Sequence, residues 1–227
     1  MENPRQELEK AIAQGDLQKL LRSTGLLHGH YCPGSAMGVK AAARAVNELR
    51  VKSTGMEEII AIVETNSCFA DGVQMVTGCS LGNNALIYRD YGKMAVTLAR
   101  RTGEAVRIAA KPSGLTMEER EPEAMALFGK VVKERQGTEE DDRRLRHMWI
   151  EISFRMLEIP DEELFSISRL NIEIPAYARI FASVNCSVCG ENVMQPRSRL
   201  IDSRYFCLPC SGQAYYQLAG DGMSIIG

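Results

Sequence analysis

Four cysteines near the C-terminus constrain the fold of this chain more than any other feature of its sequence. Cys186 and Cys189 form one C-x₂-C pair, Cys207 and Cys210 form a second, and seventeen residues separate the two pairs. Two such pairs at this separation are typical of a tetrahedral tetrathiolate zinc site, which leaves no coordination position open for a substrate. The spacing therefore predicts structural zinc. The intervening segment RLIDSRYF predicts the short strands of a zinc ribbon or treble-clef finger.

The remainder of the chain is long enough to form a second, larger domain. With 227 residues in total, we expect an α+β domain over residues 1–175 and a zinc-binding domain over residues 176–227. Apolar periodicity predicts helices packed on a mainly antiparallel sheet. The helices are expected at 4–22, 33–49, 68–77 and twice within 117–158, and the strands at 58–65, in three segments between 85 and 111 that resemble a meander, and at 166–174.

Composition excludes several classes of protein. Hydrophobic residues make up 45% of the chain, and no segment has the ~18 consecutive apolar residues needed to span a bilayer. The N-terminus, MENPRQELEK, has no apolar stretch or cleavage site of a secretory signal. We therefore expect a soluble cytoplasmic protein that does not bind membranes. A net charge of -2 provides no general attraction to nucleic acid, although three arginines of the C-terminal segment could form a local patch.

Three further cysteines raise the question of function, because reducing conditions in the cytoplasm disfavour disulfides. One of them, Cys32, lies within the segment LLHGHYCPG, together with His28 and His30. The two imidazoles suit zinc, nickel or iron, and a thiolate favours the softer ions. Cys32 also precedes a helix expected to begin at Pro33, where the helix dipole can activate a thiol as a nucleophile. The alternative is that the histidines form loop hydrogen bonds and Cys32 is a core residue.

The other two cysteines, Cys68 and Cys79, flank the short helix predicted after the strand at 58–65. Asp71 lies almost one turn after Cys68, so both can project into one cleft. A straight helix would hold the two thiols roughly 16 Å apart, too far for shared ligation. A chain reversal at Gly78 is therefore required if Cys79 is to return toward Cys68.

The segments HGHYCPGSAMGVKAA and ETNSCFADGVQMVTGCSLGNNALIYRDYGKMAV resemble the FmdE-like family of formylmethanofuran dehydrogenase components, over about Leu26 to Val96. The enzyme reduces carbon dioxide onto methanofuran with a molybdenum or tungsten pterin and iron-sulfur centres, and the FmdE component is accessory to it. Many relatives also carry a C-terminal zinc finger. The resemblance implies an accessory role in molybdopterin-enzyme, metal or one-carbon metabolism. It also implies a cleft lined by His30, Cys32, Cys68, Asp71, Cys79 and Lys93, with His28 matching a frequent form of the opening motif.

Two models of the cleft remain open, and the sequence leaves open whether the protein is an enzyme. In the ligand model, Cys68 and Cys79 bind a second transition metal together with His28 or His30, and Asp71 orients a histidine or water. In the nucleophile model, Cys32 or Cys68 attacks a substrate and a histidine acts as base. The residues assigned to catalysis are Cys32, Cys68, Asp71 and Lys93.

The partners follow from these alternatives. We expect a homodimer formed through the helices within 117–158, and either a small-molecule ligand or molybdenum or tungsten enzyme subunits as partners. A competing hypothesis is a zinc-ribbon adaptor or transcriptional regulator that binds nucleic acid or protein. A third is a purely structural component of a complex.

Overall fold

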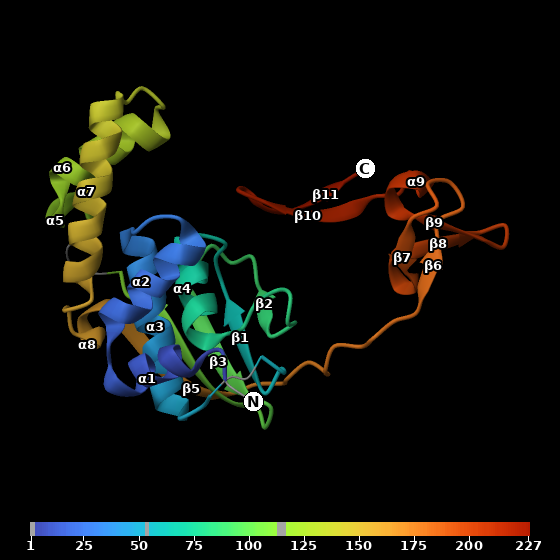
Figure 1. The fold of residues 1–227 in the computed structure, drawn as a ribbon, viewed down its shortest axis with the longest axis horizontal. Helices are drawn as coiled ribbons and strands as arrows, with labels where there is room; N and C mark the ends of the chain where they lie inside the picture. Colours follow the sequence, from blue (N-terminus) through green and yellow to red (C-terminus); the bar gives the residue numbers. More distant parts are fainter. Residues whose placement is uncertain (1–2, 53–54, 113–116) are drawn as a thin grey trace. The chain divides into compact units, whose positions relative to one another are not determined.

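The computed structural model describes residues 3–52, 55–112 and 117–227. The chain divides into two compact units, Met1–Pro175 and Ala176–Gly227. The first unit contains a sheet and most of the helices, and the second contains three short two-stranded sheets (Figure 1). None of the described helices combines the length and the apolar character that crossing a bilayer demands.

Five strands form the sheet of the first unit in the order β2-β1-β3-β4-β5. β1 pairs in parallel with β2, and the other three pairings are antiparallel, which confirms a mainly antiparallel sheet. The segments between 85 and 111 do not form a simple meander, because β1 lies between β2 and β3. The strands are β1 (Ile59–Val63), β2 (Leu86–Tyr88), β3 (Ala95–Arg100), β4 (Glu104–Ala110) and β5 (Phe165–Asn171).

The N-terminal segment forms two helices rather than the single helix predicted over 4–22. α1 (Gln6–Gln14) ends at Gly15, which has a left-handed φ of 68°, and Asp16 then caps α2 (Leu17–His28) by accepting from the Lys19 N–H. α2 continues to His28, beyond residue 22, where the predicted helix ends. Tertiary packing explains the difference, since Leu20, Leu21 and Thr24 are buried on one face of α2.

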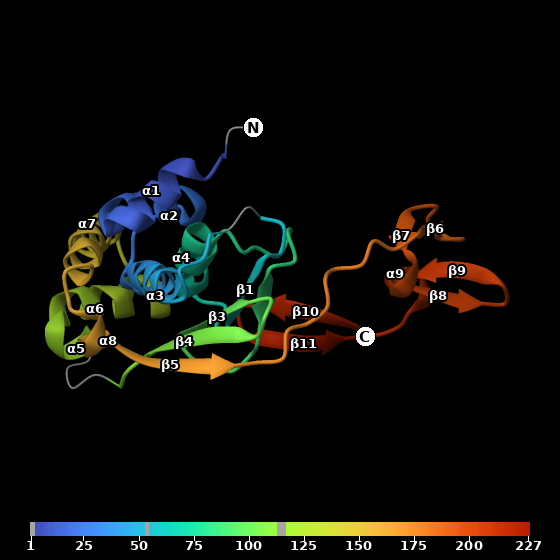
Figure 2. The same cartoon turned by 90° about the horizontal axis from the view of Figure 1, so that it is seen from below.

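α3 (Pro33–Leu49) and α4 (Cys68–Thr77) form the layer that covers one face of the sheet (Figure 2). Their backbones cross in close contact. A Cβ on Gly38 would lie 2.1 Å from the Phe69 carbonyl oxygen, and one on Gly72 would lie 2.6 Å from the Ser35 carbonyl oxygen. The two glycines therefore allow a distance between α3 and α4 that no larger residue permits.

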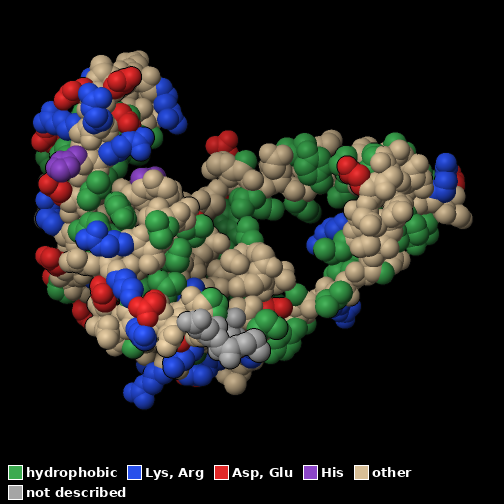
Figure 3. Space-filling view, in the orientation of Figure 1, with side chains coloured by type: hydrophobic (Ala, Val, Ile, Leu, Met, Phe, Trp, Pro, Cys, Tyr) green, Lys and Arg blue, Asp and Glu red, His purple; other side chains and the backbone are tan. Residues whose placement is uncertain are grey.

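The segment between β4 and β5 is mainly helical: α5 (Met117–Arg120), α6 (Pro122–Phe128), a π-helical turn (Gly129–Lys133), α7 (Glu139–Met156) and α8 (Asp161–Leu164). Charges of both signs cover this segment in Figure 3 and form ion pairs with one another, such as Arg146 with Asp142 and Lys130 with Asp141. Leu145, Trp149 and Ile152 on the inner face of α7 are buried in an apolar cluster that also contains Cys32.

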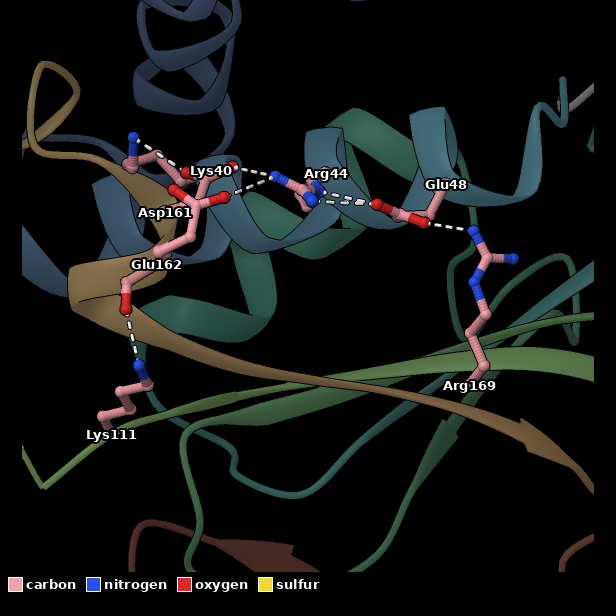
Figure 4. A network of polar contacts seen from close by, with 7 residues as sticks. All are labelled: Lys40, Arg44, Glu48, Lys111, Asp161, Glu162 and Arg169. Carbon is pink, nitrogen blue, oxygen red and sulfur yellow. Dashed lines mark hydrogen bonds and ion pairs between the residues drawn. The ribbon is translucent and has the colours of Figure 1, made fainter.

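A polar network joins α3 to the chain around α8 and β5 (Figure 4). The Lys40 side chain is 4% exposed, and its ammonium contacts Asp161 at 3.1 Å and donates to the Leu157 carbonyl at 2.9 Å. Arg44 contacts Asp161 and Glu48, and Glu48 in turn contacts Arg169 of β5. Because Lys40 is buried, these partners are needed to offset the loss of hydration of its charge.

The second unit is built from hairpins. β6 pairs with β7, β8 with β9 and β10 with β11, all antiparallel, and the predicted strands of the segment RLIDSRYF are confirmed as β8 and β9. The elements are β6 (Ser183–Asn185), β7 (Asn192–Met194), a 3₁₀ turn (Gln195–Arg197), β8 (Ser198–Ile201), β9 (Arg204–Cys207), α9 (Leu208–Ser211), β10 (Tyr215–Ala219) and β11 (Gly222–Ile226).

Candidate metal centres

The four C-terminal cysteines converge as their spacing predicts. Cys186 and Cys189 flank the turn after β6, and Cys207 and Cys210 lie at the end of β9 and on α9. Each sulfur lies within 4.8 Å of the other three, and the sulfurs of Cys189 and Cys207 are 3.9 Å apart. A tetrahedral ion with bonds of about 2.3 Å to sulfur would separate neighbouring sulfurs by about 3.8 Å, so the cluster fits zinc.

Backbone N–H groups stabilise the thiolate form of Cys186 in this cluster. The N–H groups of Cys207, Cys189 and Val188 lower the pKa of Cys186 to about 6, and the Cys207 N–H lies 3.4 Å from the Cys186 sulfur. The turn closes through a hydrogen bond from Gly190 N–H to the Cys186 carbonyl, with Gly190 at φ 78°. A left-handed residue at this position suits glycine. Zinc requires deprotonated cysteines, and these N–H groups favour that form of Cys186.

A second cluster of metal-ligating groups joins His28, His30 and Cys32, whose ligand atoms lie within 4.8 Å of one another. His28 is the last residue of α2, Cys32 is the N-cap of α3, and His30 lies in the short connection between the two helices. The two imidazole rings have centroids 4.4 Å apart. Two imidazoles and one thiolate are the donors that zinc, nickel and iron accept. Three protein ligands leave a coordination position open, so the donor set fits such an ion.

His28 makes polar contacts through both of its ring nitrogens. Nε2 lies 3.7 Å from the Cys32 sulfur, and Nδ1 lies 2.7 Å from an Asp71 oxygen. Gln74 Nε2 donates to the other Asp71 oxygen at 3.0 Å. A carboxylate on one imidazole nitrogen fixes the ring so that the other nitrogen faces the ligand position. Gln74 has no role in the sequence-based prediction, although its spacing of three from Asp71 on a helix is a signal for such a contact.

The electrostatics of Cys32 and His28 reinforce one another. Burial opposes protonation of His28, but the hydrogen bond with Asp71 and the nearby Cys32 raise its pKa. The pKa of Cys32 is lowered to about 5, first by its hydrogen bond with Cys68 and further by Ser35 and His28. Burial of Cys32 acts in the opposite direction but is outweighed. The site therefore favours a Cys32 thiolate, which is the form that binds a metal or attacks an electrophile.

Cys68 lies next to Cys32 but outside the cluster of three ligand groups. Its hydrogen bond with Cys32 and its burial raise the pKa of the Cys68 thiol. A Cβ on Gly34 would lie 3.1 Å from the Cys68 Cβ and 3.9 Å from the Cys32 sulfur. Gly34 thus leaves the space in which the two cysteines approach each other.

One residue of the predicted cleft lies elsewhere. Cys79 follows α4 at the end opposite Cys68, is fully buried, and its sulfur contacts the Ile59 carbonyl oxygen at 3.9 Å. The chain turns at Gly78, but it turns toward the start of β1, so Cys79 does not return to Cys68. Lys93 is exposed and lies near Glu64. The hydrogen bond from Arg107 lowers the pKa of the Glu64 carboxyl against the opposing effect of burial, and the charge of Lys93 adds a smaller lowering effect.

Comparisons with known proteins find two family models and a curated relative that match this sequence. Residues 27–166 match the family model described as "FmdE, Molybdenum formylmethanofuran dehydrogenase operon", and residues 179–216 match the prokaryotic dksA/traR C4-type zinc finger. A curated relative from Archaeoglobus fulgidus, described as a probable S-adenosyl-L-methionine-binding protein, is 41% identical over 220 residues. The match covers 95% of this chain but only 58% of that relative.

A solved structure has a similar fold. The crystal structure of an FmdE-like protein of the tungsten formylmethanofuran dehydrogenase type, from Syntrophus aciditrophicus, superposes with a TM-score of 0.55 at 23% sequence identity. The superposition covers 86% of this chain and 92% of that protein. At this identity the likeness concerns the fold.

Proposed function

The chain belongs to the FmdE family, and from that premise we propose that it is an accessory metal-binding protein whose working centre is formed by His28, His30 and Cys32. The C4 finger supplies a second, structural zinc site that is closed to substrate. The observation that carries the proposal is the contact of Asp71 with Nδ1 of His28, because it leaves Nε2 directed at the Cys32 sulfur.

The proposed ligand set differs from the one expected from the sequence. In this proposal Cys32, rather than Cys68 and Cys79, supplies the thiolate, and both histidines are ligands, because these three groups lie within 4.8 Å of one another. A metal bound by three protein ligands supplies a Lewis acid with an open position. The chain's own groups then have defined roles: Asp71 orients His28, Gln74 orients Asp71, and the apolar side chains around Cys32 limit access of water.

We propose a role beside a molybdenum or tungsten enzyme in metal or one-carbon metabolism, and the molybdenum enzyme named in the family description supports this proposal. Four of the seven cysteines belong to the zinc finger, and the chain has no dense cysteine run for an iron-sulfur relay, so we propose no dehydrogenase reaction for it. The Archaeoglobus relative is described as a probable S-adenosyl-L-methionine-binding protein, so S-adenosylmethionine is the first ligand to test in a binding titration. The amino or carboxylate group of S-adenosylmethionine can occupy an open metal position.

Metal stoichiometry on anaerobically purified protein tests the proposal. Wild type should bind about two ions per chain, whereas Cys32→Ser and His28→Ala should retain only the ion of the C4 finger. Cys79→Ala and His147→Ala are matched controls, because Cys79 and His147 lie outside both clusters. The proposal fails if wild type binds a single ion, or if the Cys32 variant still binds two.

A second candidate function is thiol nucleophile chemistry, favoured by the order Cys32, His28, Asp71 along one line of contacts. In that arrangement His28 takes the proton of Cys32 and Asp71 holds the imidazole. His30 distinguishes the two functions. His30→Ala should lower metal affinity but leave the rate of Cys32 alkylation in metal-free protein unchanged, whereas loss of alkylation without loss of metal affinity would contradict the metal assignment.

A further inference from the structure

We propose that Cys32 and Cys68 form a redox-active dithiol that closes to a disulfide and reopens on reduction. Neither the family match nor the C4 finger assigns this pair a joint role. The pairing rests on the positions of the two cysteines in the fold, and its consequence for the metal rests on the proposed function of the His28, His30 and Cys32 cluster.

The two cysteines lie on either side of Gly34. A Cβ at that glycine would lie 3.1 Å from the Cys68 Cβ and 3.9 Å from the Cys32 sulfur, and Cys68 packs against the apolar cluster that contains the buried Cys32. A disulfide requires Cβ atoms about 3.5 to 4.5 Å apart, so it is restricted to side chains that face one another. Among the described residues, Cys79 is excluded as a competing partner, since its sulfur is fully buried against Ile59 at the other end of α4.

The backbones of α3 and α4 fix the positions of the two cysteines. Cys32 is the N-cap of α3 and Cys68 is the first residue of α4, and the two helices pack closely against each other at Gly38 and Gly72. Gly34 leaves the volume between the two side chains free, because any Cβ at that position would contact both cysteines. The fold thus brings together the starts of two helices that β1 separates along the chain.

The chemistry is balanced with a hydroperoxide as the oxidant. The Cys32 thiolate attacks hydrogen peroxide, the O–O bond breaks, and a sulfenic acid and hydroxide form. The Cys68 sulfur then attacks the sulfenic sulfur, the S–O bond breaks, and a second hydroxide leaves as the S–S bond forms. Each cysteine loses one electron, the peroxide gains two, and the two hydroxides take up the two thiol protons as water.

Disulfide formation would remove the only thiolate from the cluster of three ligand groups. Two imidazoles alone hold a divalent ion more weakly than two imidazoles and a thiolate, so oxidation should release the metal. The presence of a metal ion at this cluster would then depend on whether Cys32 and Cys68 are reduced or oxidised. The zinc ion of the C4 finger would not depend on this pair.

Peptide mapping of the full chain tests the inference. Metal-loaded and metal-stripped protein are treated with hydrogen peroxide, alkylated and digested, using the Cys79→Ala variant so that each tryptic fragment of the first unit carries at most one cysteine. We expect a cross-link between the Cys32 and Cys68 fragments that dithiothreitol reverses. In Cys68→Ser, Cys32 should instead accumulate sulfenic and sulfinic acid.

The outcomes separate the two proposals. A cross-link accompanied by loss of about one metal equivalent supports both, and a cross-link in protein that never bound a second ion supports the dithiol while contradicting the proposed function. Full alkylation of both cysteines after peroxide, at doses that oxidise the C4 cysteines, overturns the dithiol. A cross-link with the second ion retained overturns the coupling between them.

Discussion

At the scale of single residues, His28 links Asp71 to Cys32 in the N-terminal centre, because each of its two ring nitrogens contacts one of them. Asp71 accepts on one side at 2.7 Å and Cys32 lies 3.7 Å away on the other. The sequence identifies His28, Cys32 and Asp71 as candidates, but it cannot show that they form one line. That arrangement depends on α2 ending at His28 and on α4 presenting Asp71 toward it.

Removing the carboxylate should weaken the metal centre without removing a ligand. In Asp71→Asn the amide cannot stabilise a partly charged imidazole, so we expect affinity for the second zinc ion to fall about 10- to 100-fold. Competition with a chromogenic chelator measures this change. Asp142→Asn is the control, because Asp142 pairs with Arg146 on the surface of α7. Equal affinities in the two variants would remove Asp71 from the site.

The Glu64 carboxylate makes a stability contribution that depends on pH. It is almost buried and accepts two hydrogen bonds from Arg107, at 2.6 and 2.7 Å, and this contact lowers its pKa. A lowered folded-state pKa stabilises the fold above the unfolded pKa, and the contribution is lost as pH falls through the folded-state value.

Glu64→Gln should therefore cost about 2 kcal/mol of unfolding free energy at neutral pH. This figure lies in the lower part of the range for charged hydrogen bonds because the Arg107 side chain is 30% exposed. Denaturant titrations should show the gap to wild type closing as pH falls below about 4. The exposed Glu139→Gln is the control and should change stability by less than about 0.5 kcal/mol. A gap independent of pH would show that packing, not charge, is responsible.

At the scale of elements, local signals define helix starts and stops better than they define pairing. Pro33 and Gly78 mark the start of α3 and the end of α4 as predicted, because each acts through its own backbone. The parallel pairing of β2 with β1 is decided by long-range packing, which no local pattern contains. The same is true of Cys79, whose direction after Gly78 depends on where β1 begins.

Replacing Gly38 should disturb the contact between α3 and α4. In Gly38→Ala the added methyl would meet the Phe69 carbonyl oxygen at 2.1 Å, so the helices must move apart at a cost of at least about 2 kcal/mol. Thermal denaturation measures the loss. Gly129→Ala provides the control, since a Cβ there meets no atom within 4 Å and its φ is already helical. Equal stability of the two variants would contradict the packing described here.

At the scale of the whole molecule, the two units owe their stability to different interactions. The first has an extended apolar core formed by α1 to α4 and the sheet, with Phe69, Leu20 and Leu98 fully buried. The second has mostly exposed side chains, including Tyr216 and Ile225 of its last hairpin. A unit of this size with so little core needs a crosslink, and the four cysteines provide it. The cysteine spacing alone is sufficient to predict this.

Zinc removal should therefore unfold one unit and spare the other. Hydrogen exchange measured after complete chelation should show loss of protection in β6 to β9, because structural zinc supplies the folding free energy of such a unit. The strands β1, β3 and β4 should keep their protection, since buried apolar side chains, rather than a tetrathiolate cluster, form their core. Cys186→Ser should show the same loss in β6 to β9 without chelator. Protected β6 to β9 amides in verified metal-free protein would mean that side-chain packing, rather than the thiolate cluster, holds this unit together.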